Sequence, residues 1–188
     1  EVNSLLVVMV QAAEKILSEL GSCRFLLPVA DSIDPELIRK RLGDNPLGIQ
    51  LLEGQSYDVM NSCDMLIIAS GSATLEAGII GCPMVIIYKL NPLTYFLAKL
   101  LVNAPLVGLV NIVAEEEVVP ELIQNKVTAE NISAEVLAVL RAPEKEKAIR
   151  ERLLKIKNTL GKPGVMKVVA KRIAVFMERL SANEKNPI

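Results

Sequence analysis

The residue types best suited to chemistry lie together in the segment 69–76, whose sequence is Ala-Ser-Gly-Ser-Ala-Thr-Leu-Glu. An apolar run over 64–69 is broken at Gly71, and a helical pattern begins within two residues. The start of a helix carries free N–H groups and about half a unit of positive charge, and a glycine lets an anion approach closely. A pyrophosphate therefore fits this segment. Its donors would be the N–H groups of Ser72, Ala73 and Thr74 and the hydroxyl groups of Ser70, Ser72 and Thr74.

Ordinary helix capping is an alternative explanation of the same segment. The side chain of Ser70 or Ser72 can accept a hydrogen bond from a first-turn N–H group, and the local pattern supports capping and anion binding equally. The spacing of Glu76 favours a nucleotide over simple capping. A capping box needs its acid three residues after the cap, and Glu76 lies four after Ser72. Its carboxylate is then available to both hydroxyl groups of a ribose. The alternative for Glu76 is a solvated glutamate stabilised by the helix dipole.

Composition excludes several kinds of chemistry. Histidine is absent from the 188 residues, so Ser-His-Asp and Cys-His nucleophiles and histidine metal sites are excluded. The net charge of −1, with acids and bases mixed, offers no clustered basic surface to a nucleic acid. Cys23, Cys63 and Cys82 form no C-x-x-C pair, which indicates reduced thiols in a cytoplasmic protein. We expect no metal and no other cofactor.

The apolar pattern predicts the fold class. Hydrophobic residues make up 51% of the chain and aromatic residues only 3%, an aliphatic surplus typical of a parallel sheet covered by helices. We expect strands at 24–29, 47–52, 64–69, 84–88 and 107–110, the third being buried on both faces. We expect helices at 5–20, after a cap at Asp34, and at 56–62, 72–80, 93–102, 119–124 and 133–140.

These elements predict a Rossmann-like parallel sheet with helices on both faces and a ligand crevice at the carboxyl ends of the strands. Two charged helices follow, with apolar stripes at 149, 153, 156 and 160 and at 165, 169, 173, 176 and 180. We place a nucleotide-sugar binding domain at 1–140 and extra C-terminal helices, packed on it or on another domain, at 141–188. Because the chain starts inside a helix and not at a methionine, we expect upstream sequence.

A longer, ordered series of motifs resembles the lipid-A-disaccharide synthase family, over nearly all of the chain. The resemblance implies the C-terminal, donor-binding half of a GT-B glycosyltransferase. The family transfers the sugar of UDP-2,3-diacylglucosamine to 2,3-diacylglucosamine 1-phosphate by an inverting displacement, which forms a β-1,6-linked disaccharide and releases UDP. The motifs are Ser70 to Glu76, Gly81-Cys82-Pro83-Met84-Val85, Tyr88-Lys89, Pro92-Leu93-Thr94-Tyr95, Asn111-Ile112 and Val119-Pro120-Glu121-Leu122.

The resemblance assigns roles to single residues. Residues 71–74, with Ser70, would hold the pyrophosphate, Glu76 the ribose, and Asn111 the phosphate or sugar. Tyr88 and Lys89 would lie beside the nucleotide, where Lys89 offsets phosphate charge unless it is an ordinary surface lysine.

Glu121 belongs to the last motif of the series, and Gln124 ends the matching stretch 70–124. For Glu121, a first-turn position in a helix that starts after Pro120 is an equally good explanation. The family's acceptor site and catalytic base belong to an N-terminal domain upstream of Glu1, so none of the residues named here is catalytic and we expect this fragment to be inactive alone.

The sequence departs from the family pattern at two places. Ser72 stands where the family usually has threonine, and Ala-Glu-Glu-Glu at 114–117 replaces a segment that commonly carries a positive charge. The apolar stretch 90–110 contains Asn91, Pro92 and Lys99, so it is no spanning helix. It is either a surface for acyl chains or a buried helix.

The resemblance implies a cytoplasmic protein at the inner face of the inner membrane, with the acylated acceptor bound through the upstream domain, and it is compatible with a homodimer. Two alternatives stay open: another GT-B enzyme that uses UDP-N-acetylglucosamine, and a non-catalytic α/β interaction module.

Overall fold

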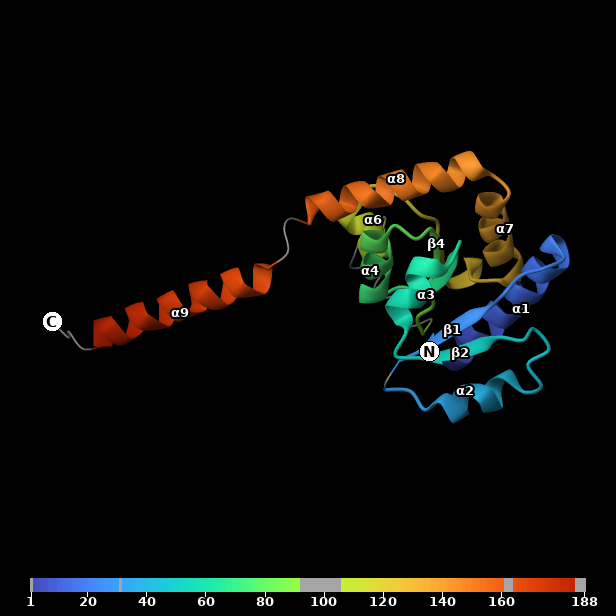
Figure 1. Cartoon of the computed structure of the whole chain (residues 1–188), viewed down its shortest axis with the longest axis horizontal. Helices are drawn as coiled ribbons and strands as arrows, with labels where there is room; N and C mark the ends of the chain where they lie inside the picture. The colour runs from blue at the N-terminus through green and yellow to red at the C-terminus, as the bar shows by residue number, and fades with distance from the viewer. Residues whose placement is uncertain (1, 31, 92–105, 161–163, 185–188) are drawn as a thin grey trace. The chain divides into compact units, whose positions relative to one another are not determined.

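A computed structural model describes residues 2–30, 32–91, 106–160 and 164–184 of the chain (Figure 1). The chain forms two compact units, Glu1–Lys157 and Asn158–Ile188. The strands of the first unit are β1 (Leu26–Val29), β2 (Gln50–Glu53), β3 (Leu66–Ala69), β4 (Met84–Tyr88) and β5 (Glu121–Ile123). Its helices are α1 (Val2–Leu20), α2 (Pro35–Leu42), α3 (Ser56–Ser62), α4 (Ser72–Ile80), α6 (Leu109–Ala114), η1 (Gln124–Lys126), α7 (Ala129–Leu140) and α8 (Pro143–Thr159), the last ending just past the boundary.

All strand pairs in the described residues are parallel. β1 pairs with β2, and β3, β4 and β5 form a second sheet in that order. Ala69 of β3 lies opposite Ile87, and Tyr88 of β4 lies opposite Ile123. The carboxyl ends of three strands therefore meet at one edge of this sheet, which is where a parallel α/β fold places its ligand.

The central strand, β4, is buried on both faces. Val85 and Ile87 pack with residues of α1 and α7, whereas Met84 and Ile86 pack with residues of α4, α6 and α8. Figure 1 shows these two groups of helices on opposite sides of β4. An uninterrupted apolar strand is what two covered faces require. The predicted α/β fold with helices on both faces is confirmed.

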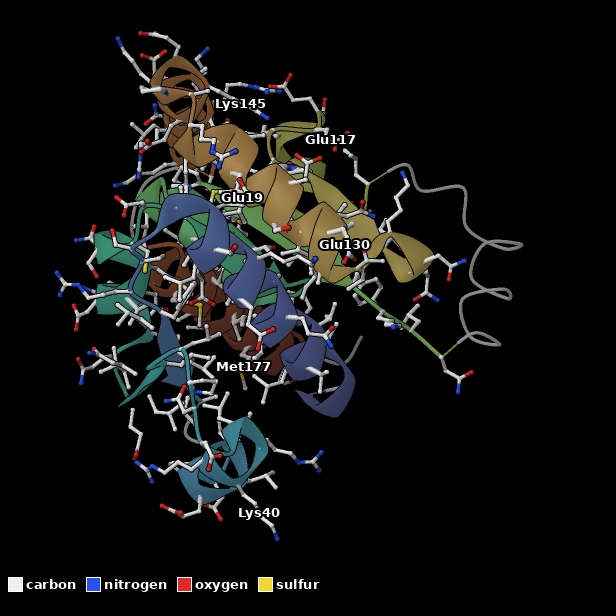
Figure 2. All side chains as sticks on the ribbon, turned by 90° about the vertical axis from the view of Figure 1, so that its right-hand side faces the viewer. Glu19, Lys40, Glu117, Glu130, Lys145 and Met177 are labelled. Atoms are coloured by element: carbon white, nitrogen blue, oxygen red, sulfur yellow. The ribbon has the colours of Figure 1, made fainter. Side chains whose placement is uncertain are left out.

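Helices α1 and α7 form one of the two layers. They lie side by side in Figure 2, with Glu19 labelled on α1 and Glu130 on α7. Arg141 pairs with Glu19 at 2.7 Å and Lys15 pairs with Glu130 at 3.1 Å across this contact. Because all four side chains are largely exposed, apolar packing holds the layer and the ion pairs add little.

Several predicted helix ends are confirmed. Asp34 caps α2 by accepting the N–H of Glu36 at 2.9 Å, and Pro35 is its first residue. α4 ends at Gly81, whose φ of 88° is the left-handed conformation that glycine adopts most easily. The apolar stripe of α8 is buried at Ile149, Leu153 and Ile156, which makes α8 part of the first unit.

Three expectations about the sheet and its neighbours are wrong. Residues 107–110 are no strand, because Leu109 starts α6. Residues 119–124 are no helix, because Glu121–Ile123 is strand β5, paired with β4 from Ile86 onward. The third strand, β3, is an edge strand of its sheet and is half-buried, not buried on both faces.

Other expectations concern two further helices. The predicted helix 93–102 lies outside the described residues. The second unit contains α9 (Val165–Glu184), the second predicted amphipathic helix. Among the described residues, no helix is long and apolar enough to cross a membrane.

Candidate functional site at the carboxyl edge of the sheet

The predicted anion segment lies where β3 passes into α4. The N–H of Ser70 donates to the carbonyl of Ile87 at 3.0 Å, which extends the sheet by one residue. Gly71 is the N-cap of α4 and is extended, and no side chain caps the helix. Capping by Ser70 or Ser72, the alternative suggested by the sequence, is therefore contradicted.

The donors of this segment differ in their availability. Thr74 is fully buried, and both its N–H and its hydroxyl group donate to the carbonyl of Gly71, at 3.1 and 2.8 Å. The hydroxyl of Ser70 donates to the carbonyl of Val107 at 3.2 Å. The described contacts leave the N–H groups of Ser72 and Ala73 and the hydroxyl of Ser72 for a ligand. Thr74 therefore stabilises the first turn of α4 from its buried side.

Glu76 lies on α4, half-buried, just beyond this first turn. Helix α3, which carries Tyr57 in its first turn, packs against α4. The Glu76 carboxylate raises the pKa of the Tyr57 hydroxyl. Sequence reasoning did not find Tyr57, because the helical pattern of 56–62 says nothing about which side chains of α4 it meets.

Glu121 supports the segment against which Ser70 packs. Its carboxylate accepts the N–H of Val107 at 2.8 Å and the N–H of Gly108 at 2.9 Å. A Cβ on Gly108 would lie 2.3 Å from Cδ1 of buried Ile86, so glycine is needed there. Glu121 was expected either in the site or in the first turn of its own helix. It stands in β5 and places its charge at the start of α6 instead.

Asn111 is fully buried in the same network. Its Nδ2 donates to the carbonyl of Val119 and to Glu121, both at 2.8 Å. Its Oδ1 accepts the N–H groups of Val118 and Val119, at 2.9 and 3.1 Å. Both donors and both lone pairs are therefore in use. The expected phosphate or sugar contact of Asn111 has no free donor here, and the side chain instead ties α6 to β5.

Gln124 performs a similar task beyond the end of β4. Its Oε1 accepts the N–H of Leu90 at 2.7 Å, and its Nε2 donates to the carbonyl of Leu90 at 3.2 Å. Gln124 itself has a positive φ of 53°. The two hydrogen bonds between Gln124 and Leu90 fix the course of the chain after Tyr88 and Lys89. Tyr88 is half-buried and Lys89 is exposed.

The structure thus brings the predicted residues together at one edge of the sheet and separates them into two groups. Ser72, Ala73, Glu76, Tyr88 and Lys89 are at least partly exposed and lie at or near the ends of β3 and β4. The remaining ones hold the backbone around them: Ser70, Thr74, Asn111, Glu121 and Gln124. Among the residues described, no cluster of Cys, Asp or Glu could hold a metal ion.

A parallel sheet covered on both faces, with an uncapped helix start at its carboxyl edge, defines a Rossmann-like α/β domain of the kind that forms one half of a GT-B fold. Comparison of the sequence with models of protein families identifies the family. The model of the lipid-A-disaccharide synthetase family matches residues 1–170, and the chain belongs to this family.

Curated relatives carry the same name. The chain is 39% identical over 177 residues to the lipid-A-disaccharide synthase of Syntrophus aciditrophicus, which covers 94% of the chain and 45% of that protein. It is 37% identical over 178 residues to the synthase of Nitrosococcus oceani, covering 95% and 46%, and 38% identical over 170 residues to that of Geobacter sulfurreducens, covering 90% and 44%. The chain therefore spans a little under half the length of these relatives.

Proposed function

We propose that this chain is the donor-binding part of a lipid-A-disaccharide synthase. The reaction joins UDP-2,3-diacylglucosamine to 2,3-diacylglucosamine 1-phosphate and releases UDP. The observation that carries the proposal is the start of α4, where Gly71 is exposed and no side chain occupies the capping position. An anion is the ligand that such a helix start favours.

In the proposed complex, the N–H groups of Ser72 and Ala73 and the hydroxyl of Ser72 bind the pyrophosphate. Glu76 accepts the ribose hydroxyl groups, and Lys89 and Tyr88 line the nucleotide at the end of β4. Asn111, Glu121, Gln124 and Thr74 act through the backbone that they hold. This division follows from their hydrogen bonds, which already use their polar atoms.

The reaction breaks the bond between the anomeric carbon of the donor and its pyrophosphate oxygen, while the acceptor hydroxyl forms a new bond to that carbon from the opposite face. Negative charge develops on the departing UDP. The helix start of α4 stabilises this charge, and its N–H groups need no reorganisation during the step. The acceptor and the base that removes its proton belong, in this proposal, to the N-terminal domain of the GT-B arrangement.

The proposal extends to the surroundings of the enzyme. Its acylated substrates are lipids, so we place the protein in the cytoplasm, in peripheral contact with the inner face of the inner membrane. Residues 1–140 supply the donor site. Of the residues 141–188, those of α8 pack on this domain through Ile149, Leu153 and Ile156, and those after α8 pack on it or on the N-terminal domain. A homodimer is compatible with this arrangement.

Two measurements test the proposal. Calorimetric titration of the 188-residue chain with UDP should show saturable binding at one site, and UMP should bind more weakly because it lacks one phosphate. A folded chain that binds neither nucleotide contradicts the donor role. An assay of UDP release by the enzyme with its N-terminal domain should require 2,3-diacylated sugars. Equal rates with UDP-N-acetylglucosamine would instead support a different GT-B enzyme.

A further inference from the structure

The peptide group between Val107 and Gly108 is held at both of its polar ends by side chains at the donor edge of the sheet. Its N–H, on Gly108, donates to the Glu121 carboxylate at 2.9 Å, and its carbonyl, on Val107, accepts the hydroxyl of Ser70 at 3.2 Å. The N–H of Val107 donates to the same carboxylate at 2.8 Å. Because a peptide group is planar and stiff, these bonds connect a charged side chain of β5 to the residue that follows β3.

We call this chain of hydrogen bonds, from Glu121 through the peptide group to Ser70, the relay. A negative charge at the N–H end of a peptide group makes its carbonyl a better acceptor, and the bonds of such a chain strengthen one another by about 10–30%. The Ser70 hydroxyl has a single proton, which the bond to Val107 uses. It therefore has no proton left for a phosphate, the role suggested by the sequence, and acts on the backbone instead.

The turn between Ser70 and α4 depends on such anchors because a glycine follows. Gly71 is exposed, and no described atom beyond its chain neighbours lies within 4 Å of a Cβ placed on it, so side-chain packing does not fix it. On the helix side, Thr74 holds the carbonyl of Gly71 with two bonds, at 2.8 and 3.1 Å. On the strand side, Ser70 is held through its N–H by Ile87 at 3.0 Å and through its hydroxyl by the relay. The course of the chain into α4 is thus set from both sides.

We propose that Ser70 and Glu121 are positioning residues for the donor pyrophosphate: the relay fixes the turn at Gly71 so that the N–H groups of Ser72 and Ala73 point at the phosphates. The inference rests on the proposed function and deepens it. A preorganised turn loses less freedom when the anion binds, so the relay raises the affinity for the pyrophosphate without touching it. A role in stability alone would leave the affinity of the folded chain unchanged.

The test is an NMR titration with UDP and with uridine of four proteins: the unchanged chain, Ser70→Ala, Glu121→Gln and the double variant. Ser70→Ala should weaken UDP binding about threefold to tenfold, the effect of one hydrogen bond. It should leave uridine binding unchanged, because uridine has no phosphate. In the Glu121→Gln background, Ser70→Ala should have little further effect, because the relay is already broken.

Two more variants control the test. Ser70→Thr keeps the hydroxyl and should restore most of the UDP affinity. Ser133→Ala is the matched control, since the Ser133 hydroxyl also donates to a carbonyl, that of Glu130 on α7, and its loss should not change UDP affinity.

Three results would overturn the inference while leaving the donor role intact. They are unchanged UDP affinity of folded Ser70→Ala, equal losses for UDP and uridine, and fully additive losses in the double variant, which indicate a direct bond from Ser70 to the phosphate. Absence of UDP binding by the unchanged chain would overturn both proposals.

The amide signal of Gly108 supplies a readout that needs no ligand. Its proton donates to the Glu121 carboxylate, and the carbonyl of the same peptide group accepts the Ser70 hydroxyl. Ser70→Ala removes that hydroxyl and should shift the Gly108 amide proton upfield, because the peptide group becomes less polarised. A Gly108 signal that stays in place in a folded Ser70→Ala chain would refute the relay itself.

Discussion

Two glutamates near one edge of the sheet illustrate how hydrogen bonding divides the tasks of identical side chains. The Glu121 carboxylate accepts two backbone N–H groups and the Asn111 amide, all within 2.9 Å. The described hydrogen bonds include none to the carboxylate of Glu76, which is half-buried on α4. A carboxylate whose lone pairs accept hydrogen bonds from the protein's backbone stabilises the fold, whereas one with free lone pairs is available to a ligand.

Glu76 gives the first prediction at this scale. Glu76→Ala should lower UDP affinity by about 1–3 kcal/mol, because two ribose hydroxyl groups lose their acceptor. Calorimetry measures the change. Glu144→Ala is the matched control, since Glu144 is an exposed first-turn glutamate of α8 and should leave affinity unchanged. Unchanged affinity with Glu76→Ala would return this residue to a surface role.

Asn111 gives the opposite prediction. Asn111→Ala should lower the free energy of unfolding by at least about 1–3 kcal/mol, because the N–H groups of Val118 and Val119 lose their acceptor in the interior. Denaturant unfolding measures this loss. Asn131→Ala, at an exposed position of α7, should cost much less. An Asn111→Ala variant that is as stable as the unchanged protein but binds UDP more weakly would show that Asn111 binds the ligand directly.

At the scale of elements, α4 decides the geometry of the site because it is fixed at its C-terminal end and along its length. Its start is the proposed anion site, and its end is the glycine cap at Gly81. Arg150 of α8 donates to the carbonyl of Gly81 at 3.1 Å, and Gly78 lies against Val110 of α6. The helix therefore cannot move without displacing α6 and α8.

The contact of α4 with α6 depends on the missing side chain of Gly78. A Cβ there would lie 2.6 Å from Cγ2 of buried Val110. Gly78→Ala should therefore destabilise the protein by about 1–3 kcal/mol, although alanine is the better helix former by about 1 kcal/mol. Adding Val110→Ala should relieve the clash and reduce the penalty of the alanine. Thermal unfolding of the unchanged protein, the two single variants and the double variant measures these changes in stability. A Gly78→Ala variant more stable than the unchanged protein would contradict the close packing.

Cys82, just after α4, makes stability depend on alkaline pH. Burial raises the pKa of its thiol from 9.0 to about 12, while Arg150 opposes the shift and Cys63, Asp64 and Glu146 add to it. The unfolded chain thus releases this proton before the folded one. Stability from this group is complete below pH 9 and is lost as the pH rises from 9 towards 12.

Cys82→Ser should reduce the loss of stability between pH 9 and 12, because a serine hydroxyl does not titrate in that range. Denaturant unfolding at several pH values gives the slope. Cys23→Ser is the comparison, since Cys23 is exposed and should change the slope less. A slope that is identical with and without Cys82 would show that other groups cause the alkaline loss.

The elements also show what sequence reasoning can predict. The start and end of α4, the Asp34 cap and the strand Met84–Tyr88 follow from glycine, proline and apolar runs, which act locally. Strand β5 was mistaken for a helix because three residues are too few for a pattern, and only pairing with β4 defines them. The same limit applies to the site: the partners of Asn111 and Glu121 come from other segments, which no local pattern reveals.

At the scale of the whole molecule, the residues of the donor site all lie in the first unit, Glu1–Lys157. The family match extends from there into the second unit, and the relatives are about twice as long as the aligned segment. Donor binding is accordingly a property we assign to this chain, whereas transfer to the acceptor is assigned to the complete GT-B enzyme. The two activities can be measured separately.

NMR mapping of UDP on the isotope-labelled chain tests the central claim most directly. If the start of α4 binds the pyrophosphate, the largest amide shifts should occur at Gly71, Ser72 and Ala73, followed by those around Glu76 and Lys89. The open groove between α1 and α7, lined by Lys15 and Arg141, is the internal comparison and should not respond. Saturable shifts in that groove, with Gly71 to Ala73 unaffected, would contradict the account.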